Sequence, residues 1–184
     1  MMEDLAMHML EIIMNSIGAD ARLIRIVITD SILRNLILME IEDDGRGMTP
    51  EFLARVTDPF TTSRNTRSIG MGLAFMKGLT ETCGGSLHID STLGVGTKLT
   101  ASVQRDHIDT PPMGNIGAMM MQCIQSNEDI DYELRYVTDV NEFLFRTADI
   151  KEQLEGVSIC EPDILLWIRS YINEGIEQAK EEMR

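Results

Sequence analysis

Apolar residues recur at helical spacing from the start of the chain: Leu5, Met9, Ile12 and Ile13. A second set recurs at spacings of four, three and four residues, and it is polar: Asp4, His8, Glu11 and Asn15. Because residues three and four apart are neighbours on a helix surface, the pattern predicts an amphipathic helix over residues 2–16, with Gly18 as its stop.

The next two apolar runs are typical of strands. "RLIRIVIT" (22–29) and "NLILMEIE" (35–42) are rich in β-branched residues, and the short segment between them predicts an antiparallel pair. Thr49 and Pro50 then match an N-cap and a first helical position, which predicts a short helix through "EFLARV". Residues 57–70 are polar and without period, so a loop is expected there.

The remaining patterns alternate between helix and strand. A helix is predicted from residue 71 to the stop at Gly84 and Gly85, followed by strands at 86–92 and 97–104. After a break at "DTPPMGN" (109–115), the sequence predicts a helix at 116–125, a hairpin within 131–147 and a short helix from 147. The last predicted helix begins at 161 and carries one apolar stripe: Ile164, Leu165, Ile168, Tyr171, Ile172, Ile176 and Ala179.

Charge is distributed unevenly along the 184 residues, which contain 16 Lys and Arg and 30 Asp and Glu. Residues 1–104 have a net charge of −4, and residues 105–184 have a net charge of −10. An acidic chain repels phosphate backbones and anionic lipid, so we expect neither nucleic acid nor membrane insertion. A nucleotide is still compatible with this charge, since backbone N–H groups and a metal ion can hold phosphate.

The three cysteines, Cys83, Cys123 and Cys160, lie far apart in the sequence. Their odd number and the lack of a CxxC pair argue against a disulfide framework and predict a reducing, cytoplasmic location. The sequence has no apolar run of about 18 residues that would predict a transmembrane helix. Its start also lacks the basic and apolar regions of a signal peptide.

Four short motifs follow one another at the boundaries of predicted elements. They are "EIIMNS" (11–16) on the first helix, "DDGRGM" (43–48) after a strand, "GMGL" (70–73) opening a helix, and "GVGT" (94–97) in a hairpin. The second is unusual because Glu42, Asp43 and Asp44 stand side by side, although like charges repel. A purely structural turn would not favour that arrangement.

In this order and on these elements, the motifs resemble the N, G1, G2 and G3 boxes of the GHKL superfamily. That superfamily includes gyrase, the large heat-shock chaperones, histidine kinases and the mismatch-repair ATPases, and "DPFTTSR" (58–64) is similar to the F-box of histidine kinases. The resemblance covers residues 4–104. It implies an α+β fold, a two-layer α/β sandwich of the Bergerat ATP-binding type with a mixed, mainly antiparallel sheet.

The resemblance also implies a division of the chain. We expect an ATP-binding domain at 1–105, a linker at 106–114, and an acidic α+β docking or regulatory extension at 115–184. One helix and a hairpin cannot bury the apolar stripe of the last helix alone. The stripe is therefore expected to pack on residues 1–104, on a second copy or on a partner, and we expect a protein partner or a homodimer to form through residues 115–184.

ATP and Mg²⁺ are the cofactors that the resemblance implies. By its place in the G1 box, Asp43 is expected to accept a hydrogen bond from the adenine amino group, whereas the carbonyl of guanine would oppose this acceptor-only carboxylate. Gly45 and Gly47 would let the backbone approach the base. Thr97, in the G3 box, would donate its hydroxyl to the same aspartate or to an ordered water.

Phosphate and metal contacts are implied at the other motifs. Asn15 corresponds to the asparagine that presents an amide oxygen to Mg²⁺. Gly70 and Gly72, with Leu73, open a helix whose N–H groups suit an anion. The basic candidates for phosphate contacts are Arg64, Arg67 and Lys77.

Structural alternatives stay open for these residues: an acidic turn for Asp43, a helix C-terminal position for Asn15, and solvated loop charges for Arg64 and Arg67. Three further features are expected to be structural: a surface histidine at His8, a buried thiol at Cys83 and core methionines at 119–121.

Glu11 distinguishes the branches of the superfamily. In gyrase-like ATPases and anti-sigma serine kinases, a glutamate four residues before the asparagine acts as general base, and Glu11 matches it; an exposed helix carboxylate is the alternative. No histidine here has the sequence context of a phosphoacceptor, so a complete sensor kinase is not expected. We expect an Mg·ATP-binding signalling protein that is a stand-alone serine or split histidine kinase. A slow ATPase switch and a non-catalytic ATP-binding regulatory subunit are the alternatives.

Overall fold

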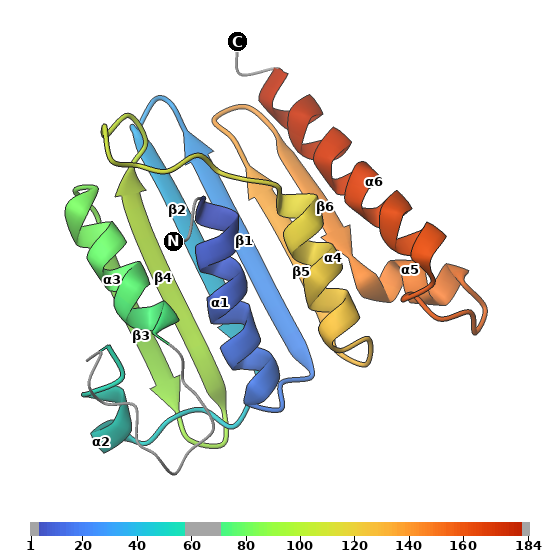
Figure 1. The fold of residues 1–184 in the computed structure, drawn as a ribbon, viewed down its shortest axis with the longest axis horizontal. Helices are drawn as coiled ribbons and strands as arrows, with labels where there is room; N and C mark the ends of the chain where they lie inside the picture. The colour runs from blue at the N-terminus through green and yellow to red at the C-terminus, as the bar shows by residue number, and fades with distance from the viewer. Residues whose placement is uncertain (1–3, 58–70, 182–184) are drawn as a thin grey trace.

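Helices cover one face of a single six-stranded sheet (Figure 1). The computed structural model describes residues 4–57 and 71–181. The strand order is β3-β4-β2-β1-β5-β6, in which β1 and β5 are parallel and every other neighbouring pair is antiparallel. This confirms the predicted α+β, two-layer architecture with a mixed, mainly antiparallel sheet.

The first half of the chain supplies four strands and three helices. They are α1 (Leu5–Gly18), β1 (Leu23–Ser31), β2 (Leu36–Asp43), α2 (Pro50–Leu53), α3 (Gly72–Thr82), β3 (Ser86–Thr92) and β4 (Gly96–Gln104). The first helix begins three residues later than predicted because Asp4 caps it, accepting a 2.8 Å hydrogen bond from the N–H of Met7. Thr49 caps α2 as predicted, through the N–H of Phe52.

The second half continues the same sheet and the same helix layer. It supplies α4 (Ile116–Ser126), β5 (Asp131–Val137), β6 (Glu142–Arg146), α5 (Thr147–Gln153) and α6 (Pro162–Glu181), which confirms each predicted element. β5 lies beside β1, with Leu23 opposite Asp131. Most of the stripe of α6 packs within its own chain, since Ile168 and Ile172 belong to the same buried cluster as Ile26 of β1. Tyr171 is the exception, because it lies at the border of the stripe and is exposed.

The connection between the halves is fixed to the start of α1. The N–H groups of Leu5 and Ala6 donate to the carbonyls of Pro112 (3.0 Å) and Met113 (2.9 Å). The first N–H groups of a helix have no partner within it, so residues 106–114 complete the N-terminal cap of α1 as they cross to α4.

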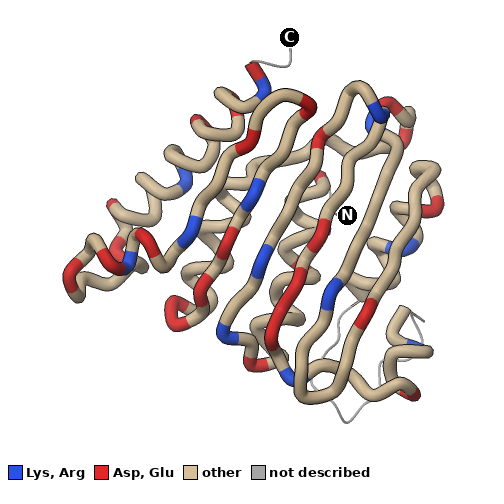
Figure 2. The backbone as a smooth tube through the Cα atoms, turned by 180° about the vertical axis from the view of Figure 1, so that it is seen from behind, with Lys and Arg blue, Asp and Glu red and all other residues tan. Residues whose placement is uncertain are grey.

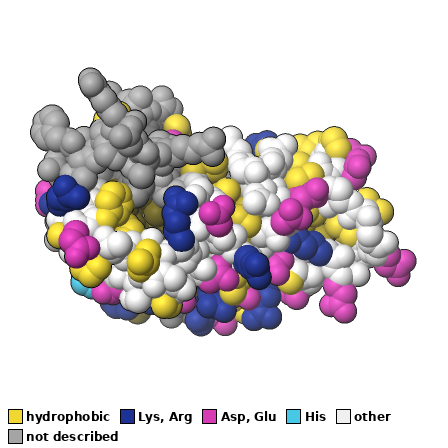
Figure 3. All heavy atoms as spheres, turned by 90° about the horizontal axis from the view of Figure 1, so that it is seen from below, with side chains coloured by type: hydrophobic (Ala, Val, Ile, Leu, Met, Phe, Trp, Pro, Cys, Tyr) yellow, Lys and Arg dark blue, Asp and Glu magenta, His cyan; other side chains and the backbone are white. Residues whose placement is uncertain are grey.

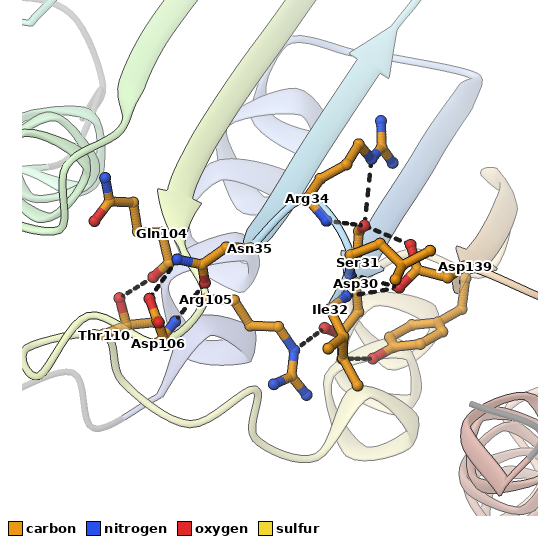
Figure 4. Close-up of polar contacts among 12 residues, drawn as sticks. Asp30, Ser31, Ile32, Arg34, Asn35, Gln104, Arg105, Asp106, Thr110 and Asp139 are labelled. Atoms are coloured by element: carbon orange, nitrogen blue, oxygen red, sulfur yellow. Dashed lines mark hydrogen bonds and ion pairs between the residues drawn. The ribbon is translucent and has the colours of Figure 1, made fainter. Parts of the chain in front are cut away.

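Polar contacts tie together the turns at the end of the sheet where β1 passes into β2 (Figure 4). Asp139, in the turn between β5 and β6, accepts hydrogen bonds from the hydroxyl of Ser31 and the N–H of Ile32. Buried Asp30 accepts from the Arg105 guanidinium at 2.6 Å and from a tyrosine hydroxyl of β5, that of Tyr136, at 3.0 Å. These contacts join residues on either side of the predicted linker.

The other face of the sheet is charged and uncovered by helices, as Figure 2 shows from behind. Acidic and basic side chains pair across neighbouring strands. Arg25 of β1 contacts Glu42 at 3.5 Å and Glu133 at 3.0 Å, and Lys98 of β4 contacts Glu40 at 3.1 Å. Exposed pairs of this kind contribute little stability. The stability of the fold therefore comes mainly from the hydrophobic core on the helix side of the sheet.

Most of the side chains expected to be structural have the burial that the sequence predicted. Cys83, Met119 and Met120 are buried, as predicted, and Met121 is partly buried against the same core. The expected surface position of His8 was wrong: only 7% of this residue is exposed, because α1 is packed against neighbouring helices as well as the sheet. Across residues 4–57 and 71–181, no helix has the length and apolar character needed to cross a membrane.

Acidification is expected to destabilise the fold through His8. Burial lowers the pKa of His8 below its ordinary value of 6.5, although nearby Asp4 acts in the opposite direction. The unfolded chain therefore binds the proton more readily, so the contribution of neutral His8 is full above about pH 6.5 and is lost as the pH falls through the folded pKa. The urea midpoint should be lower at about pH 5.5 than at about pH 7.5.

His8→Gln should reduce this pH dependence, since the substituted side chain does not titrate. Met7→Gln, which changes an exposed, non-titrating residue beside His8 on α1, is the matched control and should leave the dependence unchanged. Equal pH dependence in all three proteins would show that His8 makes no such contribution.

Candidate functional site

A pocket lies between α1, the start of α3 and the sheet, beside the loop that follows β2. Figure 3 views the molecule from this end and shows hydrophobic side chains next to basic ones. The lining residues without a polar side chain are Ile12, Ala19, Ile41, Gly47, Met48, Leu73, Ile89 and Leu99, and the polar ones are Asn15, Ser16, Asp43, Arg46 and Thr97. Mostly apolar walls with a few convergent polar groups are typical of small-molecule sites.

Asp43, the last residue of β2, points into the helix side of the sheet and is 9% exposed. Its carboxylate accepts a hydrogen bond from the hydroxyl of Ser16 at 2.6 Å and from the N–H of Gly45 at 3.0 Å. A carboxylate can accept about four hydrogen bonds, so acceptor capacity is left for a ligand in the pocket. Sequence reasoning missed Ser16, although its place one residue after Asn15 on the same helix was the available signal.

Asp44 has a different task from its neighbour. It is exposed, and its Oδ1 accepts hydrogen bonds from the N–H groups of Arg22 (2.7 Å) and Leu23 (2.9 Å) at the start of β1. The two adjacent aspartates therefore face opposite ways. Asp44 fixes the turn, and Asp43 faces the pocket.

Gly45 and Gly47 allow the loop after β2 to pass close to two other segments. A Cβ at Gly45 would lie 2.8 Å from the carbonyl oxygen of Ala19, and a Cβ at Gly47 would lie 2.1 Å from that of Thr92. Gly47 also has a φ of +64°, which glycine adopts readily. The loop is held there by a hydrogen bond from the N–H of Arg46 to Ala19 (2.9 Å).

Thr97 lines the pocket from β4, directly opposite Asp43 in the pairing of β2 with β4. Its hydroxyl is 2.9 Å from that of Ser91, which accepts a hydrogen bond from the N–H of Met48. The hydroxyl that donates to Asp43 is therefore that of Ser16. Donation from Thr97 to Asp43 was one of the two possibilities that the sequence predicted for Thr97.

Asn15 and Glu11 lie on successive turns of α1 and have different surroundings. Asn15 lines the pocket, and its buried Nδ2 atom has no hydrogen-bond partner within the described residues. Glu11 is exposed and lies against the first residue of α3, because a Cβ at Gly72 would be 3.0 Å from the Cβ of Glu11. The structure thus brings Glu11, Asn15 and the start of α3 together.

The remaining predicted site residues differ in their position relative to the pocket. Leu73 is a buried part of the pocket wall. Lys77 is exposed one turn further along α3 and is not among the described residues that line the pocket. Arg64, Arg67 and Gly70 lie outside the described residues.

Comparison with known proteins gives a family match over the first part of the chain. The family described as histidine kinase-, DNA gyrase B-, and HSP90-like ATPase matches residues 3–107. A protein of Shewanella frigidimarina whose name describes it as a sensor protein is 39% identical over 75 residues, or 40% of this chain and 12% of its own length. Sporulation kinase D of Bacillus subtilis is 33% identical over 66 residues, or 36% of this chain and 13% of its own.

A solved structure supports the fold alone. The N-terminal domain of a DNA repair protein superposes with a TM-score of 0.50 at 16% identity, covering 77% of this chain and 51% of that one. The two curated relatives above are matched over only 12% and 13% of their length.

The loop geometry yields a prediction about Gly47. Gly47→Ala should lower the free energy of unfolding by more than about 3 kcal/mol, because backbone strain is added to a clash that the loop cannot relieve. Gly94→Ala is the matched control: its φ is +78°, yet no atom of the described residues lies within 4 Å of the added Cβ, so only the strain of about 1–2 kcal/mol is expected. Urea titration of both variants measures the difference, and equal losses would contradict the close approach of Gly47 to Thr92.

Proposed function

This chain belongs to the family of histidine kinase-, DNA gyrase B-, and HSP90-like ATPases, and we propose that it binds Mg·ATP in the pocket and phosphorylates an acceptor on another protein. The stand-alone serine kinase or split histidine kinase is the form we favour. The observation that carries the proposal is the placement of Glu11, exposed at the start of α3 and one turn before Asn15 in the pocket.

The pocket residues support adenine as the bound base. Asp43 is a buried acceptor whose hydrogen bonds from Ser16 and Gly45 hold it in place. An amino group would satisfy the remaining acceptor capacity, whereas a carbonyl would oppose it. The apolar walls formed by residues such as Ile41 and Leu99 suit a planar base.

The residues at the end of the pocket near Asn15 and α3 support the binding of phosphate and magnesium. The buried amide nitrogen of Asn15 has no hydrogen-bond partner among the described residues, and a bound ligand would satisfy it. Amide oxygens are among the ligands that Mg²⁺ accepts. Gly72 begins α3, whose first N–H groups lack partners within the helix and suit an anion. Bound Mg·ATP would supply the γ-phosphate for transfer.

Glu11 would act on the acceptor as a general base. A hydroxyl must lose its proton as it attacks phosphorus, and a positioned carboxylate can take that proton. A neutral imidazole attacks through a free lone pair and needs less help, so a glutamate at this place favours a serine or threonine acceptor. Because Glu11 is exposed, a residue of another protein can reach it.

A slow ATPase that switches a partner is the second candidate. The same exposure that admits a hydroxyl of another protein also admits water to Glu11. Phosphate release without a partner would favour the ATPase, transfer to a supplied protein favours the kinase, and binding without either would favour a regulatory subunit.

Variants of Glu11 and Asn15 separate catalysis from binding. Glu11→Gln should leave the affinity for Mg·ATP nearly unchanged and lower phosphate transfer from γ-labelled ATP to proteins of the native extract by about 100-fold or more, since a general base acts in the transition state. Asn15→Ala should instead weaken the binding of Mg·ATP in calorimetry.

The matched control is Glu81→Gln, which changes another exposed glutamate in the helix layer, on α3. It should change neither binding nor transfer. If Glu11→Gln transfers phosphate as fast as Glu81→Gln, Glu11 is an ordinary surface carboxylate and the proposed mechanism is wrong.

A further inference from the structure

Two stacked aromatic rings form an exposed ridge on α6, which runs along the β6 edge of the sheet (Figure 1). Trp167 is 50% and Tyr171 is 41% exposed, and their rings stack with centroids 5.1 Å apart and an interplanar angle of 14°. Tyr171 also meets Phe143 of β6 edge-on at 5.6 Å. The ridge is therefore anchored on the sheet, while a large part of Trp167 is open to solvent.

Carboxylates stand on both sides of this aromatic pair. Asp163 is four residues before Trp167, and Glu174 is three residues after Tyr171, so all four side chains follow one another along the outer face of α6. Both carboxylates are exposed. The opposite face of the helix is buried through residues such as Ile168. The core therefore does not require the exposed surface of the ridge.

We propose that this acid–aromatic–aromatic–acid ridge binds a basic segment of a protein partner, with an arginine guanidinium stacked on Trp167. A guanidinium is planar and weakly hydrated, so it stacks on an aromatic face while forming hydrogen bonds to carboxylates at its edge. The carboxylates of Asp163 and Glu174 would complement the charge of such a segment.

Charge argues against the other occupants. A second copy would bring the acidic ridge against its own like charges, in a part of the chain whose net charge is −10. An apolar helix would cover the two carboxylates without partners, which is costly. The proposal concerns a surface on α6 that contributes nothing to the lining of the pocket beside α1, so it holds or fails independently of nucleotide binding.

Trp167 is the single tryptophan of the chain, so tryptophan fluorescence reports directly on the ridge. We would titrate the full chain at low salt with capped hexa-arginine, hexalysine and hexaglutamate and follow tryptophan fluorescence. Hexa-arginine should change the fluorescence at clearly lower concentrations than hexalysine, and hexaglutamate should have no effect.

Substitutions test the stacking and the charges separately, with calorimetry replacing fluorescence where Trp167 is lost. Trp167→Ala should weaken hexa-arginine binding by about fivefold or more, whereas Leu166→Ala, which removes an equally exposed neighbour on the same helix, should not. Asp163→Asn combined with Glu174→Gln keeps the core intact and should also weaken binding.

Three results would overturn the proposal. They are equal binding of hexa-arginine and hexalysine, equal affinity in Trp167→Ala and Leu166→Ala, and concentration-dependent self-association that shifts the tryptophan emission without any peptide.

Discussion

Burial of the Asp43 carboxylate is the constraint on which the pocket depends. A carboxylate removed from water must be compensated by donors, and here these are the Ser16 hydroxyl on α1 and the N–H of Gly45 in the following loop. The first donor sets the end of α1 against the end of β2. The second requires the chain to turn back at once after Asp43.

The loop then needs glycine where it passes Ala19 and Thr92, because a side chain would meet their carbonyl oxygens. Asp44 closes the arrangement by holding the first N–H groups of β1. The adjacent acidic residues that looked unfavourable in the sequence thus form two separate hydrogen-bonded sites, one facing the pocket and one facing solvent.

A second constraint is that β1 would be an edge strand without the C-terminal part of the chain. β5 pairs with it in parallel, and the helices α4 and α6 extend the layer that covers the sheet. The chain reaches β5 from β4, which runs in the same direction, so a long crossover connection is needed. Residues 105–130 supply it while capping the start of α1. The segment expected to serve docking therefore also completes the core, and it leaves the aromatic ridge on the outer face of α6 exposed to solvent.

Local patterns were sufficient to predict the elements, but not how distant segments meet. Periodicity placed each helix and strand, and the caps at Asp4 and Thr49 set where two helices begin. No local sequence pattern predicts the parallel pairing of β5 with β1, since this pairing joins residues more than 100 positions apart. For the same reason periodicity misplaced His8, which shares a stripe with exposed Glu11 but is covered by other elements.

The site was predicted in part for similar physical reasons. The motifs identified Asp43, Asn15 and Thr97, and the structure gathers them around one pocket. The donor to Asp43 could not be chosen from the sequence, because Ser16 and Thr97 both carry a hydroxyl and only the packing of α1 on β2 brings one of them to 2.6 Å. The family match then agrees with the resemblance that the ordered motifs indicated.

We propose that the free acceptor capacity of Asp43 selects adenine. Calorimetry of ATP and GTP binding to the unmodified protein and to Asp43→Asn measures this selection. The unmodified protein should prefer ATP by about a hundredfold or more, and Asp43→Asn should weaken ATP binding by about 1–3 kcal/mol because a buried polar group is left mismatched. Equal affinity of the unmodified protein for ATP and GTP, or unchanged ATP affinity in Asp43→Asn, would show that Asp43 does not select the base.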